Sequence, residues 1–368
     1  MANHLESQAT GCWTFKEQDA DGAYTGREAS FAGVDLTPLR YSDLDGMKLD
    51  GPISIPLNLS NARIVASNIP ELSVEAAASI QTTLSSPYTN KSIGLVRGGW
   101  LPSGLALRSN MVVMPDRCTI SDLASRYQDG QKIRAGDDFL DLFQDKPVRI
   151  NPGLFALEGN CRQLPAPCEV EEQWAEACRK IRTALPQAQL TPDAAVVGLI
   201  GILDELREST ERKMQFLRQL APILQSPISA TRRSEVLQQV LDIAQTCGLQ
   251  RNTLVVLAAL SIVCVKNGAG PAKRIIKPSA KYSKQDAYNA LADFRALELL
   301  INLYALFPQE QIMLCTGDKN LALFWAGIRA SGFSVNGHNP DSYTYKLSPI
   351  EALLPNVPPD LLSAYLVS

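Results

Sequence analysis

The stretch KYSKQDAYNALADFRALELLINLYALFPQEQIMLCTGDKNLALFW, residues 281–325, predicts three elements in succession. Its first part predicts a long amphipathic helix, because apolar side chains recur at the three- and four-residue spacing of one helical face. The apolar positions are Ala287, Ala290, Leu291, Phe294, Leu297, Ile301 and Tyr304. The second part, QIMLCTGDKNLALF, predicts a buried strand, a tight turn and another helix. A strand that leads directly into a helix is the basic unit of an α/β sheet.

Two aspartates in this stretch occupy positions that core packing does not explain. Asp286 lies near the start of the first helix, and Asp318 lies just after the strand. Asp286, Asn289 and Asp293 also form a polar line along the helix, and the continuation of that line is apolar. A solvent-facing stripe would stay polar to its end, so the pattern indicates a local site in the first half of the helix.

The composition is that of a globular protein. The chain has 368 residues, which is long enough for two or three domains, and 45% of them are hydrophobic. The net charge of −3 is no global nucleic-acid signature, so nucleic-acid binding must rest on local basic patches. No signal peptide is recognisable and the longest apolar run, residues 253–265, is too short to cross a bilayer, so we expect a cytoplasmic protein without a membrane partner. The eight cysteines lack the spacing of a zinc site or a disulfide framework, and we expect free thiols.

The chain divides into regions of different texture. Residues 1–105 are rich in Gly, Pro, Ser and Asn with short β-type runs, so we expect an irregular, mainly β N-terminal extension with one helix within residues 72–84. Residues 106–345 predict an α/β domain, in which residues 169–250 are helical. Residues 346–368 form a C-terminal tail.

A second strand ends in an acid far upstream. Residues 111–114 (MVVM) predict a buried strand, which Pro115 and Asp116 follow as a turn. A helix is then expected to begin near Thr119 or Ser121. Ligand sites in α/β sheets lie at the carboxyl ends of the strands, so Asp116 is a candidate site residue.

The segment between the two strand-end acids is mostly helical. Residues 136–145 predict an acidic amphipathic helix, and residues 147–152 predict a strand. Glu158 then stands amid apolar residues. Further along, residues 191–193 (TPD) are a typical helix start, and residues 253–265 predict a helix buried in the core.

Asp116, Asp286 and Asp318 occupy comparable positions, and Glu158 is a fourth candidate. Gathered at one edge of a sheet, these carboxylates would repel one another unless a cation neutralised them. Carboxylate oxygens suit Mg²⁺ and Mn²⁺, which activate water for attack on a phosphodiester. The chain has only two histidines, so no histidine-rich site competes.

The order of these motifs resembles that of the PIN-domain nucleases. The counterparts of the family's acids are Asp116 in MVVMPDR, Glu158 in FALEGN, Asp286 in DAYNALAD and Asp318 in LCTGDKNLALF. Thr316 matches the family's hydroxyl residue, which helps to hold the metal or to order the acids. Asp293, two helical turns after Asp286, is a candidate accessory ligand, but an exposed acid on the helix is the favoured interpretation. The resemblance implies an α/β, three-layer PIN-like domain with a parallel central sheet, in which residues 169–250 would be a helical insertion.

The activity that the resemblance implies is Mg²⁺- or Mn²⁺-dependent cleavage of RNA or single-stranded nucleic acid by an endonuclease. Two features depart from the family pattern. The stretch between Glu158 and Asp286 is longer than a compact PIN domain needs, and Asp116 is followed by Arg117 and Cys118 in place of the usual Thr/Ser-Asn. Whether the chain has a protein partner or forms a homo-oligomer stays open.

A basic segment leads directly to Asp286. It contains Lys273, Arg274, Lys277, Lys281, Tyr282 and Lys284. We expect a loop here whose cations contact phosphates beside the cut, with Tyr282 stacking on a base. A solvated, lysine-rich loop is the other interpretation.

Each acid also has a purely structural explanation. Ser283 and Asp286 fit a capping box, Asp318 fits a helix N-cap, and Asp116 fits a turn. A PIN-like scaffold that binds RNA or protein without turnover is therefore one alternative function. A phosphatase similar to the haloacid dehalogenases is a weaker one, because that class needs an acid two residues after its nucleophile, where this chain has Cys118.

Overall fold

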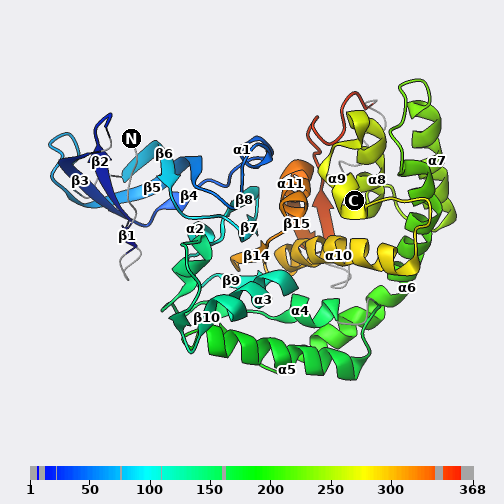
Figure 1. Ribbon diagram of the computed structural model, residues 1–368, viewed down its shortest axis with the longest axis horizontal. Helices are drawn as coiled ribbons and strands as arrows, with labels where there is room; N and C mark the ends of the chain where they lie inside the picture. The colour runs from blue at the N-terminus through cyan, green and yellow to red at the C-terminus, as the bar shows by residue number, and fades with distance from the viewer. Residues whose placement is uncertain are drawn as a thin grey trace.

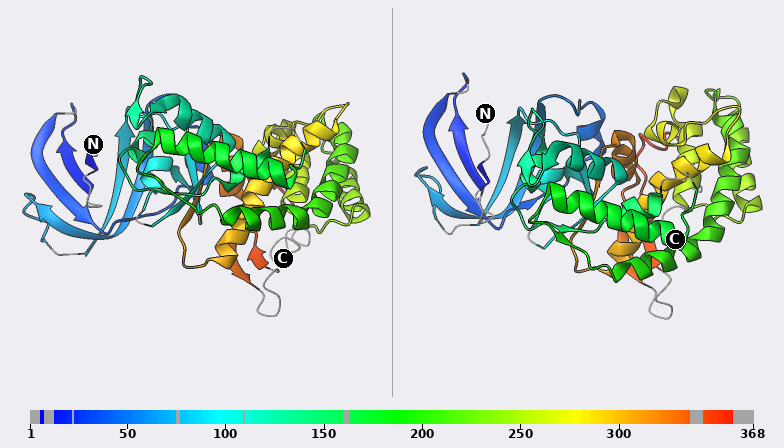
Figure 2. Two further views of the ribbon diagram at one scale, coloured as in Figure 1. Left: turned by 90° about the horizontal axis from the view of Figure 1, so that it is seen from below. Right: turned by 60° about the horizontal axis from the view of Figure 1, so that its bottom comes forward.

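The structure is a computed structural model that describes residues 6–7, 13–21, 23–74, 77–108, 110–159, 163–335 and 343–357. An N-terminal sheet, a central sheet and a group of helices follow one another along the long axis of the molecule (Figure 1). The N-terminal sheet lies at one end, and helices α6 (Ala195–Leu224) and α7 (Arg233–Thr246) lie at the other, as further views also show (Figure 2).

The N-terminal sheet is antiparallel and is organised around one long strand. Its strands are β1 (Glu6–Ser7), β2 (Trp13–Gln18), β3 (Tyr24–Ala32), β4 (Asp35–Leu36), β5 (Ile53–Ser67) and β6 (Ala77–Ser86). The strand β5 pairs with β3, β4 and β6. Its alternate residues Ile53, Ile55, Leu57 and Leu59 are buried in the main core, as the period of two in a strand requires. A short helix, α1 (Tyr41–Asp45), follows β4.

The sequence predicts a helix within residues 72–84, and this prediction is wrong. Residues 72–74 are not helical, and residues 77–84 belong to the strand β6. Ile80 and Leu84 pair with Leu59 and Ile55 of β5. The alanine-rich pattern favours a helix only weakly, and a full ladder of hydrogen bonds beside a long strand overrides it.

The central sheet is mixed, not purely parallel as predicted. Its strands are β7 (Ile93–Val96), β8 (Gly99–Pro102), β9 (Val112–Pro115), β12 (Arg149–Ile150), β13 (Gln189–Leu190) and β14 (Ile312–Thr316), in the order β13-β12-β9-β14-β7-β8. The first four in this order are parallel, whereas β7 and β8 form a hairpin that adds to β14 in the antiparallel sense. Because β7 and β8 precede residue 106, the central sheet also includes chain that the sequence assigns to the N-terminal extension.

The strands β9 and β14 bring two distant parts of the chain to one edge of the sheet. They are parallel neighbours, and Pro115 at the end of β9 pairs with Cys315 of β14. The Asp116 backbone N–H still donates to the Cys315 carbonyl at 2.8 Å, one residue beyond the strand. The loops that carry Asp116 and Asp318 therefore leave the sheet side by side.

Helices pack against the central sheet and against one another. Their bounds are α2 (Ser103–Ala106), α3 (Arg117–Arg126), α4 (Gly153–Glu158), α5 (Pro167–Ala184), α8 (Leu254–Cys264), α9 (Pro271–Ile276), α10 (Lys284–Leu306) and α11 (Lys319–Ile328). Both α3 and α4 contact β9, and both α10 and α11 contact β14. The predicted long helix and the predicted core helix are confirmed as α10 and α8, and every residue of α8 is buried.

The predicted helical region at residues 169–250 is confirmed by α5, α6 and α7. The predicted start of α6 at Pro192 is three residues too early, because the helix begins at Ala195. The Thr191 backbone N–H still donates to the Ile150 carbonyl at 3.0 Å, which extends the pairing of β13 past the expected cap. The Asp193 carboxylate accepts a hydrogen bond from the Trp174 indole at 3.0 Å.

Short elements complete the described part of the chain. They are β10 (Tyr127–Gln128), β11 (Gln131–Lys132), the 3₁₀ helices η1 (Phe139–Phe143) and η2 (Lys266–Gly268), and the hairpin of β15 (Ser331–Val335) and β16 (Tyr343–Lys346). The acidic helix predicted at residues 136–145 is thus a single 3₁₀ segment, η1. The predicted tail at residues 346–368 falls within the described residues only as far as 357. No described helix combines the length and the apolar character that a membrane crossing needs.

Candidate functional site

Asp116 is the N-cap of α3. Its Oδ1 accepts a hydrogen bond from the Thr119 backbone N–H at 2.7 Å, so the helix begins at Arg117, two residues before the predicted start. The Thr316 hydroxyl and the Gly317 backbone N–H also donate to the Asp116 carboxylate. The side chain is thereby fixed at the edge of the sheet between β9 and β14.

Asp318 is the N-cap of α11 in the same way. Its Oδ1 accepts from the backbone N–H groups of Asn320 at 2.6 Å and Leu321 at 3.2 Å. Its own backbone N–H donates to Thr316 Oγ1 at 3.0 Å. Thr316 is fully buried and so links the two loops, because it contacts the Asp116 carboxylate and the Asp318 backbone at once.

A cavity of about 540 Å³ joins these two acids to two others. Glu158 reaches it as the last residue of α4, and Asp293 reaches it from the third turn of α10. The cavity is lined by Asp116, Cys118, Leu154, Leu157, Glu158, Ala292, Asp293, Arg295, Ala296, Gly317, Asp318, Lys319, Asn320 and Leu321. Asp116, Glu158, Asp293 and Asp318 are hereafter the acidic cluster.

A second cavity of about 480 Å³ adjoins the first at the same acids. It shares Glu158, Asp293 and Asp318 with the first cavity, and it adds two cationic side chains, Arg117 and Lys277. The acids therefore lie where two cavities meet, and a bound chain could continue to both sides of them.

Mutual repulsion within the acidic cluster is visible in the pKa of Asp293. Burial raises this pKa to about 8, and the carboxylates of Asp318, Glu158 and Asp116 are the next largest causes. Lys277 is the one positive charge that opposes the shift among the causes that are resolved. At neutral pH and without a cation, Asp293 thus keeps a proton that an exposed aspartate would have lost.

The pKa values of Glu158, Asp116 and Cys118 are raised as well. Burial, followed by the Asp116 charge, raises the pKa of Glu158, while Arg117 and Arg295 oppose the rise. Burial also raises the pKa of Asp116, although the hydrogen bonds from Thr316 and Thr119 lower it. For the Cys118 thiol, burial and then all four carboxylates raise the pKa to about 11. The charges of all four acids therefore act on the same thiol.

Asp286, a predicted ligand, does not line the first cavity. It is exposed, and its Oδ2 accepts from the Ser283 backbone N–H at 2.9 Å and the Ser283 hydroxyl at 2.7 Å, which completes a capping box. It reaches only the second cavity. Asp293 lies seven residues further along α10, roughly 10 Å at 1.5 Å per residue. The polar line in the sequence contained both residues, and the structure brings Asp293 to the other acids.

The predicted basic loop is partly helical, because residues 271–276 form α9. Lys273 and Arg274 lie in the last turn of α9, and Lys277 follows it in a left-handed conformation. Of the predicted substrate-binding residues, Lys277 is the one whose charge acts on Asp293. Lys281 lines a separate cavity with Arg218 of α6.

Two predicted substrate-binding residues have structural partners. Lys284 forms an ion pair with Glu211 at 3.1 Å. Tyr282 is only 7% exposed, and its hydroxyl donates to the Ile276 carbonyl at 2.6 Å. Most of the ring packs inside the protein, and its remaining surface lines the cavity that Lys281 also lines, so stacking of Tyr282 on a base stays a prediction.

The acidic cluster has the donor chemistry of a Mg²⁺ or Mn²⁺ site, since it offers four carboxylates and no imidazole. In the arrangement of the described residues, however, no group of three or more His, Cys, Asp or Glu side chains is placed to hold a metal ion. Asp116 and Asp318 each direct one oxygen to backbone N–H groups of the helix that they cap. Coordination would use their remaining oxygens and would require side-chain rotation.

Sequence reasoning did not single out several charged or polar residues of the cavity as site residues, among them Cys118, Arg295, Lys319 and Asn320. Lys319 Nζ donates to the carbonyls of Asp45 at 2.6 Å and Met47 at 2.7 Å, which ties the start of α11 to the segment after α1. Such contacts join positions more than 270 residues apart, and no local pattern signals them. No protein-family model, curated protein or solved structure matches the chain.

Proposed function

We propose that this protein is a metal-dependent nuclease with a PIN-like site, which cleaves phosphodiester bonds in RNA or single-stranded nucleic acid. The observation that supports the proposal is the convergence of Asp116, Glu158, Asp293 and Asp318 on one cavity at the ends of β9 and β14. Two of these acids are strand-end residues from distant parts of the chain, and the other two come from α4 and α10. Four acids beside one another cost stability, which a protein tolerates at functional sites.

Asp116, Asp293 and Asp318, together with Glu158, would hold one or two Mg²⁺ or Mn²⁺ ions. Such an ion supplies charge stabilisation at the reacting phosphate and lowers the pKa of water. The raised pKa of Asp293 gives binding a clear signature, since a cation would displace the Asp293 proton.

The chain's own residues would position the substrate. Arg117 and Lys277 line the second cavity and offer cationic contacts for phosphates next to the cut. Thr316 keeps the Asp116 and Asp318 loops in register, because it contacts both. Thr316 is fully buried, so its role would be to position the acids, not to touch the substrate.

The direct test is to incubate the purified protein with labelled single-stranded RNA, single-stranded DNA and duplex, with Mn²⁺ or with EDTA. We expect Mn²⁺-dependent cleavage of the single-stranded substrates. Asp318→Asn removes a member of the acidic cluster, and Asp286→Asn is the matched control on the capping box outside the first cavity. If the wild type and Asp318→Asn both leave every substrate intact, the nuclease proposal fails.

A scaffold that binds RNA or protein without turnover is the second candidate. The capping roles of Asp116 and Asp318 favour it, because those hydrogen bonds alone give both acids a structural purpose. Metal titration separates the two functions. A nuclease should be stabilised by Mn²⁺ in a way that Asp318→Asn abolishes, whereas a scaffold should show no such shift.

A further inference from the structure

The first cavity has a wall that the acidic cluster does not explain. Leu154 and Leu157 of α4 and Leu321 of α11 line it, and together they form an apolar surface beside the carboxylates. All three leucines also pack into the main hydrophobic core and are 6%, 2% and 2% exposed, so the apolar surface that they present to the cavity is small. An apolar wall next to a polar centre is typical of a pocket for a flat or apolar ligand group.

Arg295 lines the same cavity and carries an unsatisfied donor. The residue is 6% exposed, and its Nη1 donates to the Leu157 carbonyl at 3.3 Å. The guanidinium lies over the Tyr288 ring at 5.3 Å from the ring centre. Its Nη2 is buried and has no hydrogen-bond partner among the residues that the structure describes. A buried guanidinium nitrogen without an acceptor is costly, so the arrangement indicates an acceptor that arrives with a ligand.

Asn320 adds a second polar group at this cavity. Its backbone N–H caps onto Asp318, but its side-chain amide makes no hydrogen bond within the described part of the chain. An amide offers both a donor and an acceptor, whereas the guanidinium of Arg295 offers donors alone. Together the two side chains can recognise a ligand edge that is rich in acceptors.

We propose that this cavity is a nucleobase subsite for an unpaired nucleotide whose base presents carbonyl oxygens, with uracil preferred over adenine. The leucine wall would hold the ring, and Arg295 and Asn320 would bind its edge. The proposal rests on nucleic acid as the substrate class of the proposed function. It assigns the base to the first cavity, because Lys277 and Arg117 line the second.

The preference for uracil follows from hydrogen-bond polarity. Uracil presents two carbonyl oxygens, which accept from a guanidinium, and between them an N3–H, which can donate to the side-chain oxygen of Asn320. Adenine places its amino group beside its N1 and N7 acceptors, so a donor-only side chain meets a competing donor. A base inside a duplex has its pairing edge occupied, so the subsite also selects against duplex substrates.

Binding of short single-stranded RNAs tests the subsite independently of catalysis. Uridine-only and adenosine-only strands would be titrated against the full chain in EDTA, with fluorescence anisotropy as the readout. We expect the uridine strand to bind about tenfold more tightly, the size of effect that a specific base contact gives. Arg295→Lys and Asn320→Ala should each reduce this ratio, while Arg218→Lys on α6, away from the cavity, should leave it unchanged.

The outcomes distinguish this subsite from the nuclease activity. Equal affinity of the wild type for the two strands, or a preference that both cavity variants retain, overturns the subsite. Because Arg295 is buried, its variant is used only if its melting temperature matches the wild type, and Asn320→Ala decides otherwise. A uridine preference without Mn²⁺-dependent cleavage would leave the subsite standing and the nuclease proposal overturned, and cleavage without a preference would do the reverse.

Discussion

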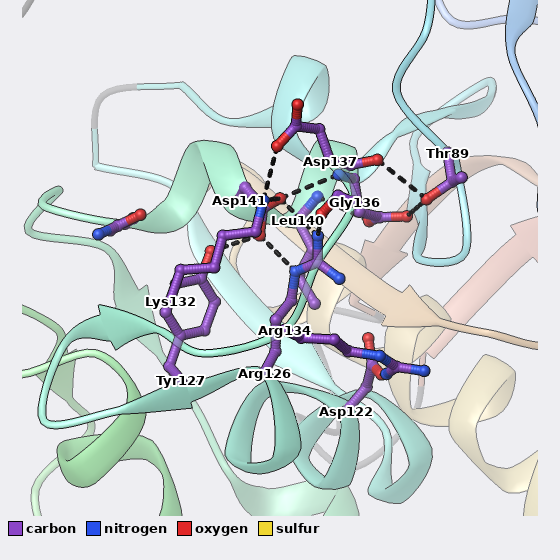
Figure 3. Close-up of polar contacts among 12 residues, drawn as sticks. Thr89, Asp122, Arg126, Tyr127, Lys132, Arg134, Gly136, Asp137, Leu140 and Asp141 are labelled. Atoms are coloured by element: carbon purple, nitrogen blue, oxygen red, sulfur yellow. Dashed lines mark hydrogen bonds and ion pairs between the residues drawn. The ribbon is translucent and has the colours of Figure 1, made fainter.

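Acidic side chains lie near both ends of α3, and the two groups differ in whether basic side chains neutralise them. At its N-terminus lies the acidic cluster, in which Asp293 faces three other carboxylates. At its C-terminal end, Arg126 and Tyr127 bond to Asp141 of η1, and Lys132 forms an ion pair with the same carboxylate at 2.8 Å (Figure 3). The second group is neutralised by side chains of the chain itself.

The pKa values record this difference. Burial would raise the pKa of Asp141, but the hydrogen bonds from Arg126, Lys132 and Tyr127 outweigh it and hold that pKa well below its usual range. At the acidic cluster, burial and carboxylates act together and raise the pKa of Asp293 to about 8. An acid group with internal partners is structural, whereas one without them is suited to a cation from outside.

The largest expected difference between the two groups is in catalysis. Asp318→Asn should reduce Mn²⁺-dependent cleavage by at least about 100-fold, because it removes a carboxylate from the proposed metal site. Asp286→Asn should stay within about twofold of the wild type, since Asp286 lies outside the first cavity. Initial rates on labelled single-stranded RNA measure both. An equal loss of cleavage rate in the two variants would indicate that Asp286 is also a metal ligand.

The largest expected difference in stability lies at the other end of α3. Asp141→Asn should lower the free energy of unfolding by about 3 kcal/mol, because it leaves the Arg126 guanidinium, which is 3% exposed, without its counter-charge. Urea denaturation at pH 7 measures the loss.

The pH dependence of the stability difference between the wild type and Asp141→Asn provides the control. A carboxyl with a lowered folded-state pKa stabilises the fold above its unfolded pKa of about 4 and loses that contribution as the pH falls. The advantage of the wild type over Asp141→Asn should therefore shrink below about pH 4. A gap that does not depend on pH would assign the effect to packing instead of charge.

Asp293→Asn should change the free energy of unfolding in the opposite direction from Asp141→Asn. The folded-state pKa of Asp293 is about 8, so its ionisation weakens the wild type progressively as the pH rises from about 4 to 8. At pH 9 without metal, Asp293→Asn should be more stable than the wild type by a few kcal/mol, and the difference should disappear near pH 4. Thermal melts across this pH range test the sign. A less stable variant at pH 9 would place Asp293 in a satisfied environment.

The smallest expected effect is the stabilisation of the wild type by Mn²⁺. At ten times its dissociation constant a ligand adds about 1.4 kcal/mol, which corresponds to a few degrees in melting temperature. Asp318→Asn should lose this shift, and Asp141→Asn should retain it on its lower baseline. A shift of equal size in all three proteins would indicate non-specific binding.

Local patterns were sufficient for the elements that depend on nearby residues. The three- and four-residue spacing of apolar side chains predicted α10, the apolar runs predicted β9 and β14, and the acid after each strand was recognisable in place. Local patterns failed where pairing with a distant strand decides the outcome, as in β6, which pairs with β5. They also could not predict that β7 and β8 add to the central sheet in the antiparallel sense.

The sequence by itself determined that Asp116 and Asp318 each follow a buried strand and precede a helix, because a buried strand followed by a helix start is a short-range pattern. Only the tertiary structure decided which acid of α10 joins them. A long helix passes a sheet edge at one turn alone, and packing against β14 and α9 places Asp293 there and leaves Asp286 in the capping box. The unsatisfied Nη2 of Arg295 has the same origin, because burial of a side chain depends on every element that packs around it.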